Sequence, residues 1–460
     1  AATIQAARAA GLERVPLRGA WSITVPGAIA SWGDAHKRFG RLAWADLLAP
    51  AIELAESFPA SPAWVGAVES GARAYGVDSD WAQAFRSLGR AWRLGEVVRL
   101  PALAKTLGRI AAEGPEEAYT GGVGRSSAAY LEAQGSPIRG SDLAEHHSDW
   151  VEPIRTEYRG VTATSHPPNS CGPIALELLN VLALEPAPAR ESFTAQGVTD
   201  ADWVHRGLEA ARLTLADRDA FLTDALAMAP DGLAILLSRE RAQELAGRID
   251  PDRVTAPPAS PLPRGGGTIY LATADRWGGC VSLIESNYAG FGSGLVDPAT
   301  GIGFQNRGAF FTLDPSHANA LAPGKRTMHT LTPGMLFRDG RPWVVHGSMG
   351  GEIQPQVYAQ FVSALVDGEL DIAAALAAPR WAADVEEHYG APVISVLESR
   401  YARAVADELE VRGHRLRWAE PFDSGLGHAH AIELVRGPDG GIESFGAATD
   451  PRSEGQPLAW

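Results

Sequence analysis

Only two cysteines, Cys171 and Cys280, occur among the 460 residues of this sequence. A disulfide-rich scaffold or a structural zinc site needs more cysteines at closer spacing, so neither is expected. No apolar run approaches the roughly 20 residues that cross a bilayer, and no secretory leader is visible. The sequence therefore predicts a soluble globular protein, placed in the cytoplasm, or in the periplasm or outside the cell if a leader has been removed.

Basic residues are in the minority, with 40 Lys and Arg against 55 Asp and Glu and a net charge of −15 at pH 7. Because the chain also lacks a Lys/Arg-rich run, we expect it to bind neither nucleic acid nor an anionic membrane surface. Hydrophobic residues make up 45% of the sequence. That share is enough for a buried core and excludes a disordered chain.

Several familiar catalytic signatures are missing. The chain has no G-x-S-x-G elbow, no phosphate-binding G-x-x-x-x-G-K-[ST] loop and no H-E-x-x-H zinc motif. His428 and His430 alternate as two ligands on one face of a strand would, but no cysteine or carboxylate accompanies them at ligand spacing. We interpret them as ordinary strand residues, and we predict no metal site and no cofactor.

The first half of the chain has helical periodicity. Apolar residues recur at helical spacing across 41–57, where Pro50 is expected to kink the helix or break it in two. A second helix is predicted over 203–222, and we interpret the charged residues 217–219 near its end as a solvated helix end with local ion pairs.

The second half is richer in strand patterns. Strands are predicted at 268–275, 280–286 and 343–349, and a hairpin is predicted around the turn at 437–440. Helical, strand-rich and mixed regions in this order favour a layered α+β protein.

A segment rich in proline and glycine covers residues 252–267 and predicts an exposed, flexible connection. Thr268 follows it directly and opens an expected strand. A mid-chain threonine hydroxyl is a poor nucleophile, whereas a chain-terminal threonine has its own α-amino group, with a pKa near ~8, as an adjacent base. The chain makes that terminus itself if the Thr268 hydroxyl attacks the Gly267 carbonyl and water hydrolyses the resulting ester.

A series of motifs, in order along nearly the whole chain, strengthens this interpretation. They are VPGAIASW (25–32), HKRFGRLAWADLLAPAIELAE (36–56), DLAEHHSDWVEPIRTEYRG (142–160), PPNSCG (167–172), LEAARLTLADRDAFL (208–222), TIYLATAD (268–275), FGSGLVDPATGIGFQNRG (291–308), APGKRTMHTLTP (322–333), GSMGG (347–351), APRW (378–381) and TDPRSEG (449–455). From about residue 20 onward the chain resembles the γ-glutamyltranspeptidase family of N-terminal-nucleophile hydrolases.

The resemblance implies an α+β fold, a four-layer αββα sandwich of the N-terminal-nucleophile hydrolase type. It also implies autocatalytic cleavage between Gly267 and Thr268. The large subunit is then 1–267 and the small subunit 268–460, and the two stay together as a heterodimer around one shared core.

The same resemblance implies the catalytic residues. Thr268 is the nucleophile and its freed α-amino group is the base. Ser286, eighteen residues downstream, stands where the family carries a hydroxyl that orients the nucleophile. The backbone amides of Gly350 and Gly351 form the oxyanion hole, a role that suits glycine because the backbone must approach a tetrahedral intermediate closely.

The substrate-binding positions implied by the resemblance are Asn287, Tyr288, Arg307, His329 and Thr330. Arg307 and Phe310 stand where the family carries amide and acidic side chains that hold the glutamyl α-amino group. An arginine repels an ammonium group and favours a carboxylate or a carbonyl. His329 and Thr330 replace the paired serines that hold the α-carboxylate and still donate hydrogen bonds to an anion.

Other departures concern the ends of the two expected pieces. Only the first of the family's Thr-Thr-His residues is kept at 268–270. The family's N-terminal segment, which includes an arginine that binds the substrate carboxylate, has no counterpart in the sequence as given unless Arg307 or another residue substitutes for it.

The resulting hypothesis is a self-processing threonine amidohydrolase or acyltransferase that acts on a small-molecule γ-glutamyl or related acyl amide. One alternative is a non-glutamyl acylase or amidohydrolase, similar to the family's cephalosporin acylases and oxamate amidohydrolases. A second is a homologue that keeps the fold and binds ligands without processing itself. A third is an unrelated hydrolase that uses Ser170 or Ser348 with a histidine.

Overall fold

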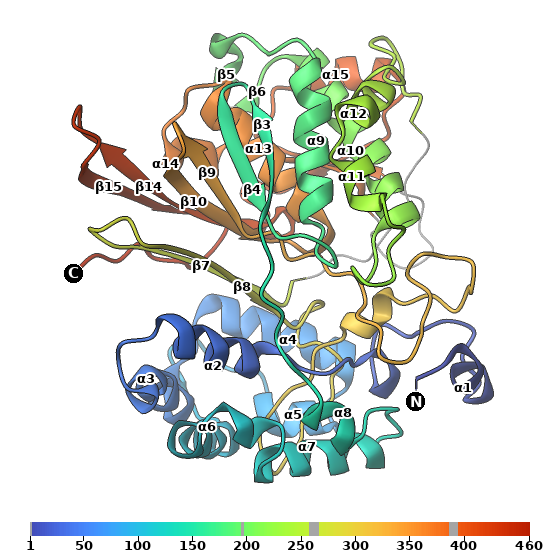
Figure 1. The fold of residues 1–460 in the computed structure, drawn as a ribbon, viewed down its shortest axis with the longest axis vertical. Coiled ribbons are helices and arrows are strands. Elements are labelled where there is room, and N and C mark those ends of the chain that lie inside the picture. Colours follow the sequence, from blue (N-terminus) through green and yellow to red (C-terminus); the bar gives the residue numbers. More distant parts are fainter. Residues whose placement is uncertain (1, 195–196, 257–265, 386–393) are drawn as a thin grey trace. The chain divides into compact units, whose positions relative to one another are not determined.

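The structure is a computed structural model of residues 1–460, and it describes residues 2–194, 197–256, 266–385 and 394–460. The chain forms two compact units (Figure 1). Unit 1 comprises Ala1–Trp150, Asn287–Ser316 and Ala320–Thr327, and unit 2 comprises Val151–Ser286, His317–Asn319 and Met328–Trp460. Each unit therefore contains residues from both sides of the Gly267–Thr268 bond.

Unit 1 is built mainly of helices. They are α1 (Ile4–Ala9), α2 (Ala28–Phe39), α3 (Trp44–Glu56), α4 (Pro62–Tyr75), α5 (Asp80–Phe85), α6 (Pro101–Glu113), α7 (Gly122–Ala133) and α8 (Gly140–Ala144), with short 3-10 turns η1 (Ala20–Ser22), η2 (Pro115–Ala118) and η4 (Arg307–Phe310). The strands β1 (Phe58–Pro59) and β2 (Val97–Val98) pair antiparallel. An aromatic cluster joins distant segments, because the Phe291 ring lies 5.2 Å from that of Trp81 and 4.8 Å from that of Phe85.

Unit 2 contains the larger sheets. Its strands are β3 (Ile154–Tyr158), β4 (Val161–Ser165), β5 (Phe193–Thr194), β6 (Gly197–Val198), β7 (Thr268–Ala274), β8 (Cys280–Ser286), β9 (Gly334–Arg338), β10 (Arg341–Met349), β11 (Trp381–Val385), β12 (Ile394–Glu398), β13 (Leu416–Ala419), β14 (His428–Arg436) and β15 (Ile442–Thr449). Six form one antiparallel sheet in the order β15-β14-β10-β9-β4-β3. The others form a sheet β11-β12-β13 and the pairs β5-β6 and β7-β8.

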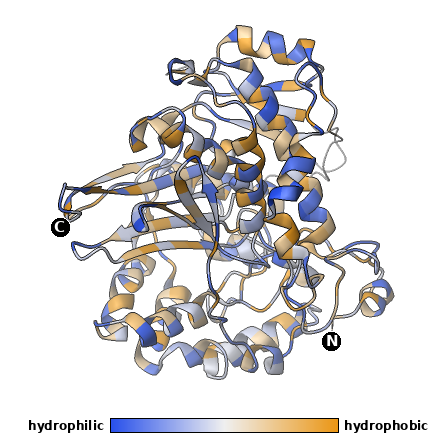
Figure 2. Ribbon diagram, turned by 45° about the horizontal axis from the view of Figure 1, so that its top comes forward, coloured by the Kyte–Doolittle hydropathy of each residue, from blue (hydrophilic) through white to orange (hydrophobic). Residues whose placement is uncertain are grey.

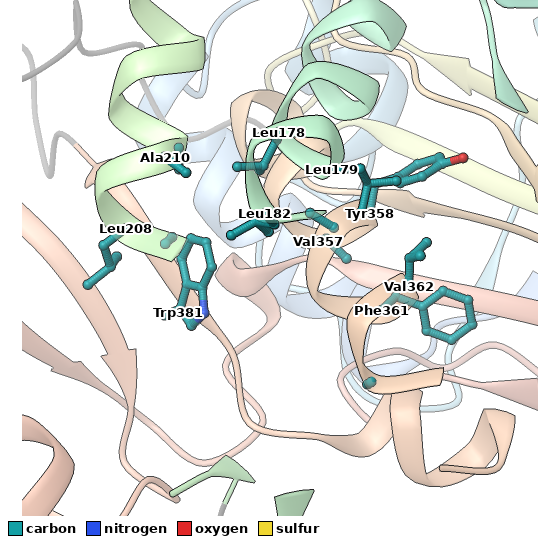
Figure 3. Close-up of a cluster of buried hydrophobic side chains, with 14 of the residues drawn as sticks. Leu178, Leu179, Leu182, Leu208, Ala210, Val357, Tyr358, Phe361, Val362 and Trp381 are labelled. Carbon is teal, nitrogen blue, oxygen red and sulfur yellow. The ribbon is translucent and has the colours of Figure 1, made fainter. Parts of the chain in front are cut away.

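The helices of unit 2 enclose its hydrophobic core. They are α9 (Gly172–Leu184), α10 (Ala201–Phe221), α11 (Gly232–Leu236), α12 (Arg239–Ala246), α13 (Gln354–Val366), α14 (Ile372–Ala377) and α15 (Arg403–Val411), with 3-10 turns η3 (Arg190–Ser192), η5 (Gly351–Ile353) and η6 (Ser424–Leu426). Figure 3 shows leucines of α9 beside residues of α10 and α13. Because α10 precedes residue 267 and α13 follows it, segments from both sides of that bond share one core.

Two consecutive residues of β10 show how unit 2 is layered. The His346 ring lies 4.5 Å from that of Tyr358 and 5.0 Å from that of Phe361, both on α13. Gly347 faces the opposite side, where Tyr270 of β7 covers it. Since neighbouring residues of a strand point to opposite faces, α13 packs on one face of the sheet and the β7–β8 hairpin on the other (Figure 1).

Hydrophobic and hydrophilic residues are interspersed along the helices and strands, as the colours of Figure 2 show. This mixture is expected of elements that bury one side only. Among the described residues, no helix combines the length and the apolar character that a membrane span requires.

Most predicted elements are present, including α3, α10, β7, β8, β10 and the β14–β15 hairpin. Of the kink or break expected at Pro50, the break does not occur, because α3 continues through that residue. The solvated part of the interpretation of residues 217–219 is wrong, because Asp217 and Arg218 are buried, whereas the expected local ion pair is present between Arg218 and Asp219. Residues 257–265 of the predicted flexible connection lie outside the described residues. Just before them, the amides of Thr255 and Ala256 donate to a Glu209 carboxylate oxygen at 2.7 and 2.8 Å.

Candidate active site

Thr268 and Ser286 face each other across the β7–β8 hairpin. Strand pairing sets Thr268 opposite Ser286, and their hydroxyl oxygens lie 2.7 Å apart. The pairing follows from the local sequence: two strands of equal length, Thr268–Ala274 and Cys280–Ser286, flank one short turn. Both residues are half-buried. The structure therefore brings together the predicted nucleophile and the residue predicted to orient it.

Tyr270 anchors this hairpin on the six-stranded sheet. Its hydroxyl lies 2.9 Å from the hydroxyl of Ser282, which also donates to the His346 carbonyl at 3.2 Å. Burial raises the pKa of the Tyr270 phenol above its ordinary value, so the group stays neutral. Thr268 thus starts a strand whose third residue is held against β10.

The double glycine follows directly where β10 ends at Met349. Gly350 and Gly351 have φ values of 156° and 56°, a region that favours glycine. A Cβ atom at Gly350 would lie 2.9 Å from Cγ1 of Ile353. The chain then turns into α13, so two successive amides are displayed in a tight, buried turn at the end of a strand that the hairpin covers.

Two arginines of unit 2 interact with this turn, one directly and the other through Gly427. Arg218 of α10 donates through Nη1 to Oε2 of Glu352, the residue after Gly351, at 2.8 Å. Arg380 donates to the Gly427 carbonyl at 2.6 Å, and Gly427 packs so closely that an added Cβ would lie 2.7 Å from the Met349 carbonyl oxygen. Glu352 is not among the residues singled out from the sequence, although an acidic residue directly after two glycines is the available signal.

Of the predicted substrate-binding residues, His329 and Thr330 belong to unit 2. The His329 amide donates to the Asn169 carbonyl at 2.9 Å, and its carbonyl accepts from the Cys171 amide at 2.8 Å. Thr330 is fully buried. The MHTLTP motif therefore lies against the PPNSCG motif.

Asn287, Tyr288 and Arg307 belong to unit 1. Tyr288 is buried, and its ring lies 4.4 Å from that of Phe310. The Arg307 guanidinium lies 5.2 Å from the Tyr288 ring, within cation–π distance. The Asn287 carbonyl accepts from the Asn306 amide at 3.2 Å. These residues form an arginine–aromatic cluster, and the chain connects it to Ser286 through Asn287.

Charged residues of the TDPRSEG and APRW motifs form a buried network that the sequence analysis does not predict. Asp450 accepts from the Arg380 and Arg452 guanidinium groups and from the Ala429 amide. Arg452 also pairs with Glu398. Burial raises the pKa of the Asp450 carboxyl, but the two arginines more than offset this and hold it below its ordinary value. The signal was present in the quoted motifs, whose charged residues are far apart in sequence.

Residues of the rejected or alternative sites have structural partners of their own. The Ser170 hydroxyl donates to the Leu331 carbonyl and accepts from the amide of Gly172, the first residue of α9. It therefore has a structural role at the start of that helix. The His430 ring stacks on Tyr270 at 6.3 Å, and His428 precedes it on β14. The described ranges contain no group of three or more potential metal-ligating residues.

The full length of the chain, residues 1–460, matches the family described as Gamma-glutamyltranspeptidase. The chain belongs to the γ-glutamyltranspeptidase family. It is 35% identical over 450 residues to the Glutathione hydrolase-like YwrD proenzyme of Bacillus subtilis (strain 168), which covers 97% of this chain and 82% of that protein. It is also 35% identical over 460 residues to the Oxamate amidohydrolase proenzyme of Klebsiella pneumoniae subsp. pneumoniae, covering 97% and 83%.

Among solved structures, the cephalosporin acylase from Bacillus halodurans matches with a TM-score of 0.88 and 36% identity, covering 100% of this chain and 82% of that chain. The predicted γ-glutamyltranspeptidase-family membership, the mixed α and β architecture and the class of enzyme, one that acts on amide bonds, are thereby confirmed. The roles of individual residues stay predictions.

Proposed function

We propose that this member of the γ-glutamyltranspeptidase family cuts itself between Gly267 and Thr268 and then uses Thr268 to cleave a small-molecule amide. The observation that carries the proposal is the 2.7 Å contact between the Thr268 and Ser286 hydroxyls at the first residue of β7. In maturation, Thr268 Oγ attacks the Gly267 carbonyl carbon, and the C–N bond breaks as the ester forms. Water then hydrolyses the ester, leaving a Gly267 carboxylate and a free Thr268 α-amino group.

In turnover, the freed α-amino group takes the proton of the Thr268 hydroxyl as the oxygen attacks the substrate carbonyl. Ser286 donates a hydrogen bond that orients the nucleophile. The amides of Gly350 and Gly351 stabilise the oxyanion of the tetrahedral intermediate. The proton passes to the leaving amine, the C–N bond breaks, and water or an acceptor amine resolves the acyl-enzyme.

The two pieces, 1–267 and 268–460, remain together as a heterodimer. Support comes from unit 2, where α9 and α10 of the first piece share one core with α13 of the second. Unfolding that core to separate the pieces would expose a large apolar area, at roughly 25 cal/mol per Å². The finer architecture is a four-layer αββα sandwich, and the helix–sheet–hairpin order within unit 2 supports three of its layers.

The acyl part of the substrate carries a carboxylate or carbonyl group and no α-ammonium group. The argument rests on Arg307, which stands where the family binds the glutamyl amino group and repels a cation. A relative named as an oxamate amidohydrolase fits this substrate class, whereas one named glutathione hydrolase-like fits a γ-glutamyl amide, so the choice between the two classes rests on Arg307. His329 and Thr330 are assigned to the distal end of the acyl group.

The test is the denatured mass of the purified protein with N-terminal sequencing of each species. We expect two fragments, the smaller one beginning with residues 268–271, Thr-Ile-Tyr-Leu. A Thr268→Ala variant is expected to remain a single chain without amidase activity. A single full-length species from the unaltered protein would contradict the proposal and favour a homologue that binds without processing. A cut or active Thr268→Ala variant would assign the chemistry to another residue.

A further inference from the structure

The turn that carries the proposed oxyanion amides ends in a charged residue with a distant partner. Glu352, directly after Gly351, accepts a hydrogen bond from Nη1 of Arg218 at 2.8 Å. The Nη2 atom of Arg218 lies 2.7 Å from Oδ1 of Asp219. The Arg218 guanidinium thus interacts both with Asp219, the next residue of α10, and with Glu352, which is 134 positions along the chain.

Because the Arg218–Glu352 ion pair is buried, it restricts the position of the Glu352 carboxylate. The Arg218 side chain is 2% exposed and that of Glu352 is 12% exposed. Burial lowers the pKa of Arg218, but the carboxylates of Asp219 and Glu352 raise it above its usual value overall, so the guanidinium is charged. A buried charge that loses its partner is costly, and a guanidinium offers its donors in a fixed fork. The Glu352 carboxylate is therefore confined to one position.

A second contact fixes the start of the turn, at Met349. Gly427 packs closely against the Met349 backbone, and the Gly427 carbonyl accepts a hydrogen bond from Arg380. The two glycine amides lie between this contact and the Arg218–Glu352 pair. Glycine backbone is otherwise free to rotate, so these two attachments limit the orientation of the amides.

We propose that Arg218 and Glu352 are positioning residues that hold the Gly350–Gly351 amides in the geometry needed to stabilise the oxyanion. The inference rests on the proposed function. It adds that an ion pair between the two pieces completes the site, because Arg218 precedes the Gly267–Thr268 bond and Glu352 follows it. In this role the two residues act on the orientation of the turn and not on the substrate itself.

The expected consequence is a loss in turnover with little change in binding. Removing one oxyanion donor costs about 10²–10³-fold in kcat, so tilting the amides without removing them is expected to lower kcat by roughly 10- to 100-fold. The KM is expected to stay within about two-fold, because the oxyanion exists only after the nucleophile attacks.

The experiment measures kcat and KM per mole of cut enzyme for Glu352→Gln, which removes the charge and keeps the shape. Arg218→Lys keeps the charge and is expected to retain more turnover than Arg218→Met. Glu185→Gln is the matched control. Glu185 pairs with Arg206, which lies on α10 as Arg218 does, but near the other end of that helix. We expect Glu352→Gln to be cut and to lose at least 10-fold in kcat, and Glu185→Gln to stay within two-fold.

Four results would overturn the inference: kcat of Glu352→Gln within two-fold of the parent, a loss confined to KM, an equal loss in Glu185→Gln, or a folded Glu352→Gln chain that stays uncut. Failure of the proposed function looks different. In that case the unaltered protein is uncut or Thr268→Ala is active, whatever the behaviour of Glu352→Gln.

Discussion

The ring of Tyr270 on β7 packs directly onto the backbone of Gly347 on β10. A Cβ atom at Gly347 would lie only 2.3 Å from Cε2 of that ring. The hydrogen of glycine therefore sets how closely the hairpin that starts with Thr268 approaches the six-stranded sheet. Because Thr268 is two residues from Tyr270, a change at this contact is transmitted to the candidate nucleophile.

Gly347→Ala is expected to lower the free energy of unfolding by about 1–3 kcal/mol, because an added methyl group forces the Tyr270 ring outward. It is also expected to slow self-cleavage. Denaturant unfolding followed by fluorescence measures the first effect. Gly446→Ala on β15 is the control, since its Cβ would meet its nearest neighbour at an ordinary 3.5 Å. Equal stability of both variants would contradict the tight contact.

Ser286→Ala is expected to slow both self-cleavage and amide turnover by roughly 10- to 100-fold, the loss of a hydrogen bond worth about 1.5–3 kcal/mol to a developing charge. The rate of fragment appearance on denaturing gels and kcat on a synthetic amide measure the two effects. Thr273→Ala removes a hydroxyl from the exposed face of the same hairpin and should leave both rates within two-fold. Unchanged rates in Ser286→Ala would remove this residue from the mechanism.

Arg307→Gln is expected to move substrate preference toward γ-glutamyl amides, because it removes a positive charge that repels an α-ammonium group. The measurement is the ratio of kcat/KM for a γ-glutamyl amide to that for an N-acyl amide without an amino group. A rise of about ten-fold corresponds to roughly 1.4 kcal/mol. Arg125→Gln, on the surface of α7, serves as the control. A constant ratio would show that Arg307 does not select the substrate.

Asp450→Asn is expected to cost about 3–5 kcal/mol of unfolding free energy, since it leaves the buried Arg380 and Arg452 without a carboxylate they share. Because the folded pKa of Asp450 is below its ordinary value, this stabilisation is present above the unfolded pKa of about 4 and is lost as the pH falls toward the folded pKa. The parent should therefore lose more stability on acidification than the variant.

Unfolding titrations at several pH values between 3 and 7 give this comparison. Asp407→Asn is the matched control, because Asp407 pairs with Arg403 on the exposed face of α15. An exposed pair of this kind is worth at most about 1 kcal/mol. If the unfolding free energies of the parent and of Asp450→Asn fell equally on acidification, the assigned role of the Asp450 carboxylate would be contradicted.

Glu177→Gln is expected to stabilise the protein at pH 7 to 8. Burial, and then the neighbouring Asp217, raise the pKa of the Glu177 carboxyl well above its ordinary value. The folded state keeps the proton while the unfolded state releases it above about pH 4.3, so the parent loses stability as the pH rises toward the folded pKa. Unfolding free energies at pH 5 and 8 test this, with the exposed Glu240→Gln as control. An equal loss in parent and variant would contradict it.

The local part of the site was predictable from the sequence. Thr268 follows a proline- and glycine-rich segment and opens a strand, and two strands around one short turn set Ser286 opposite it. Hairpin pairing depends on residues that are close along the chain, so its register follows from the strand pattern and the turn. The order of helical and strand patterns predicted the mixed α and β architecture, and the resemblance to the family supplied the catalytic roles, which stay predictions.

The tertiary structure decided which charged residues are buried and with which partners. Residues 217–219 carry the polar pattern of a solvated helix end, yet Arg218 reaches Glu352 across 134 positions. Arg380 likewise meets Asp450 across 70 positions. Helical periodicity describes the faces of an element, but the burial of a face depends on the elements that pack against it. The surroundings of the double glycine therefore emerged only from the packing of distant segments.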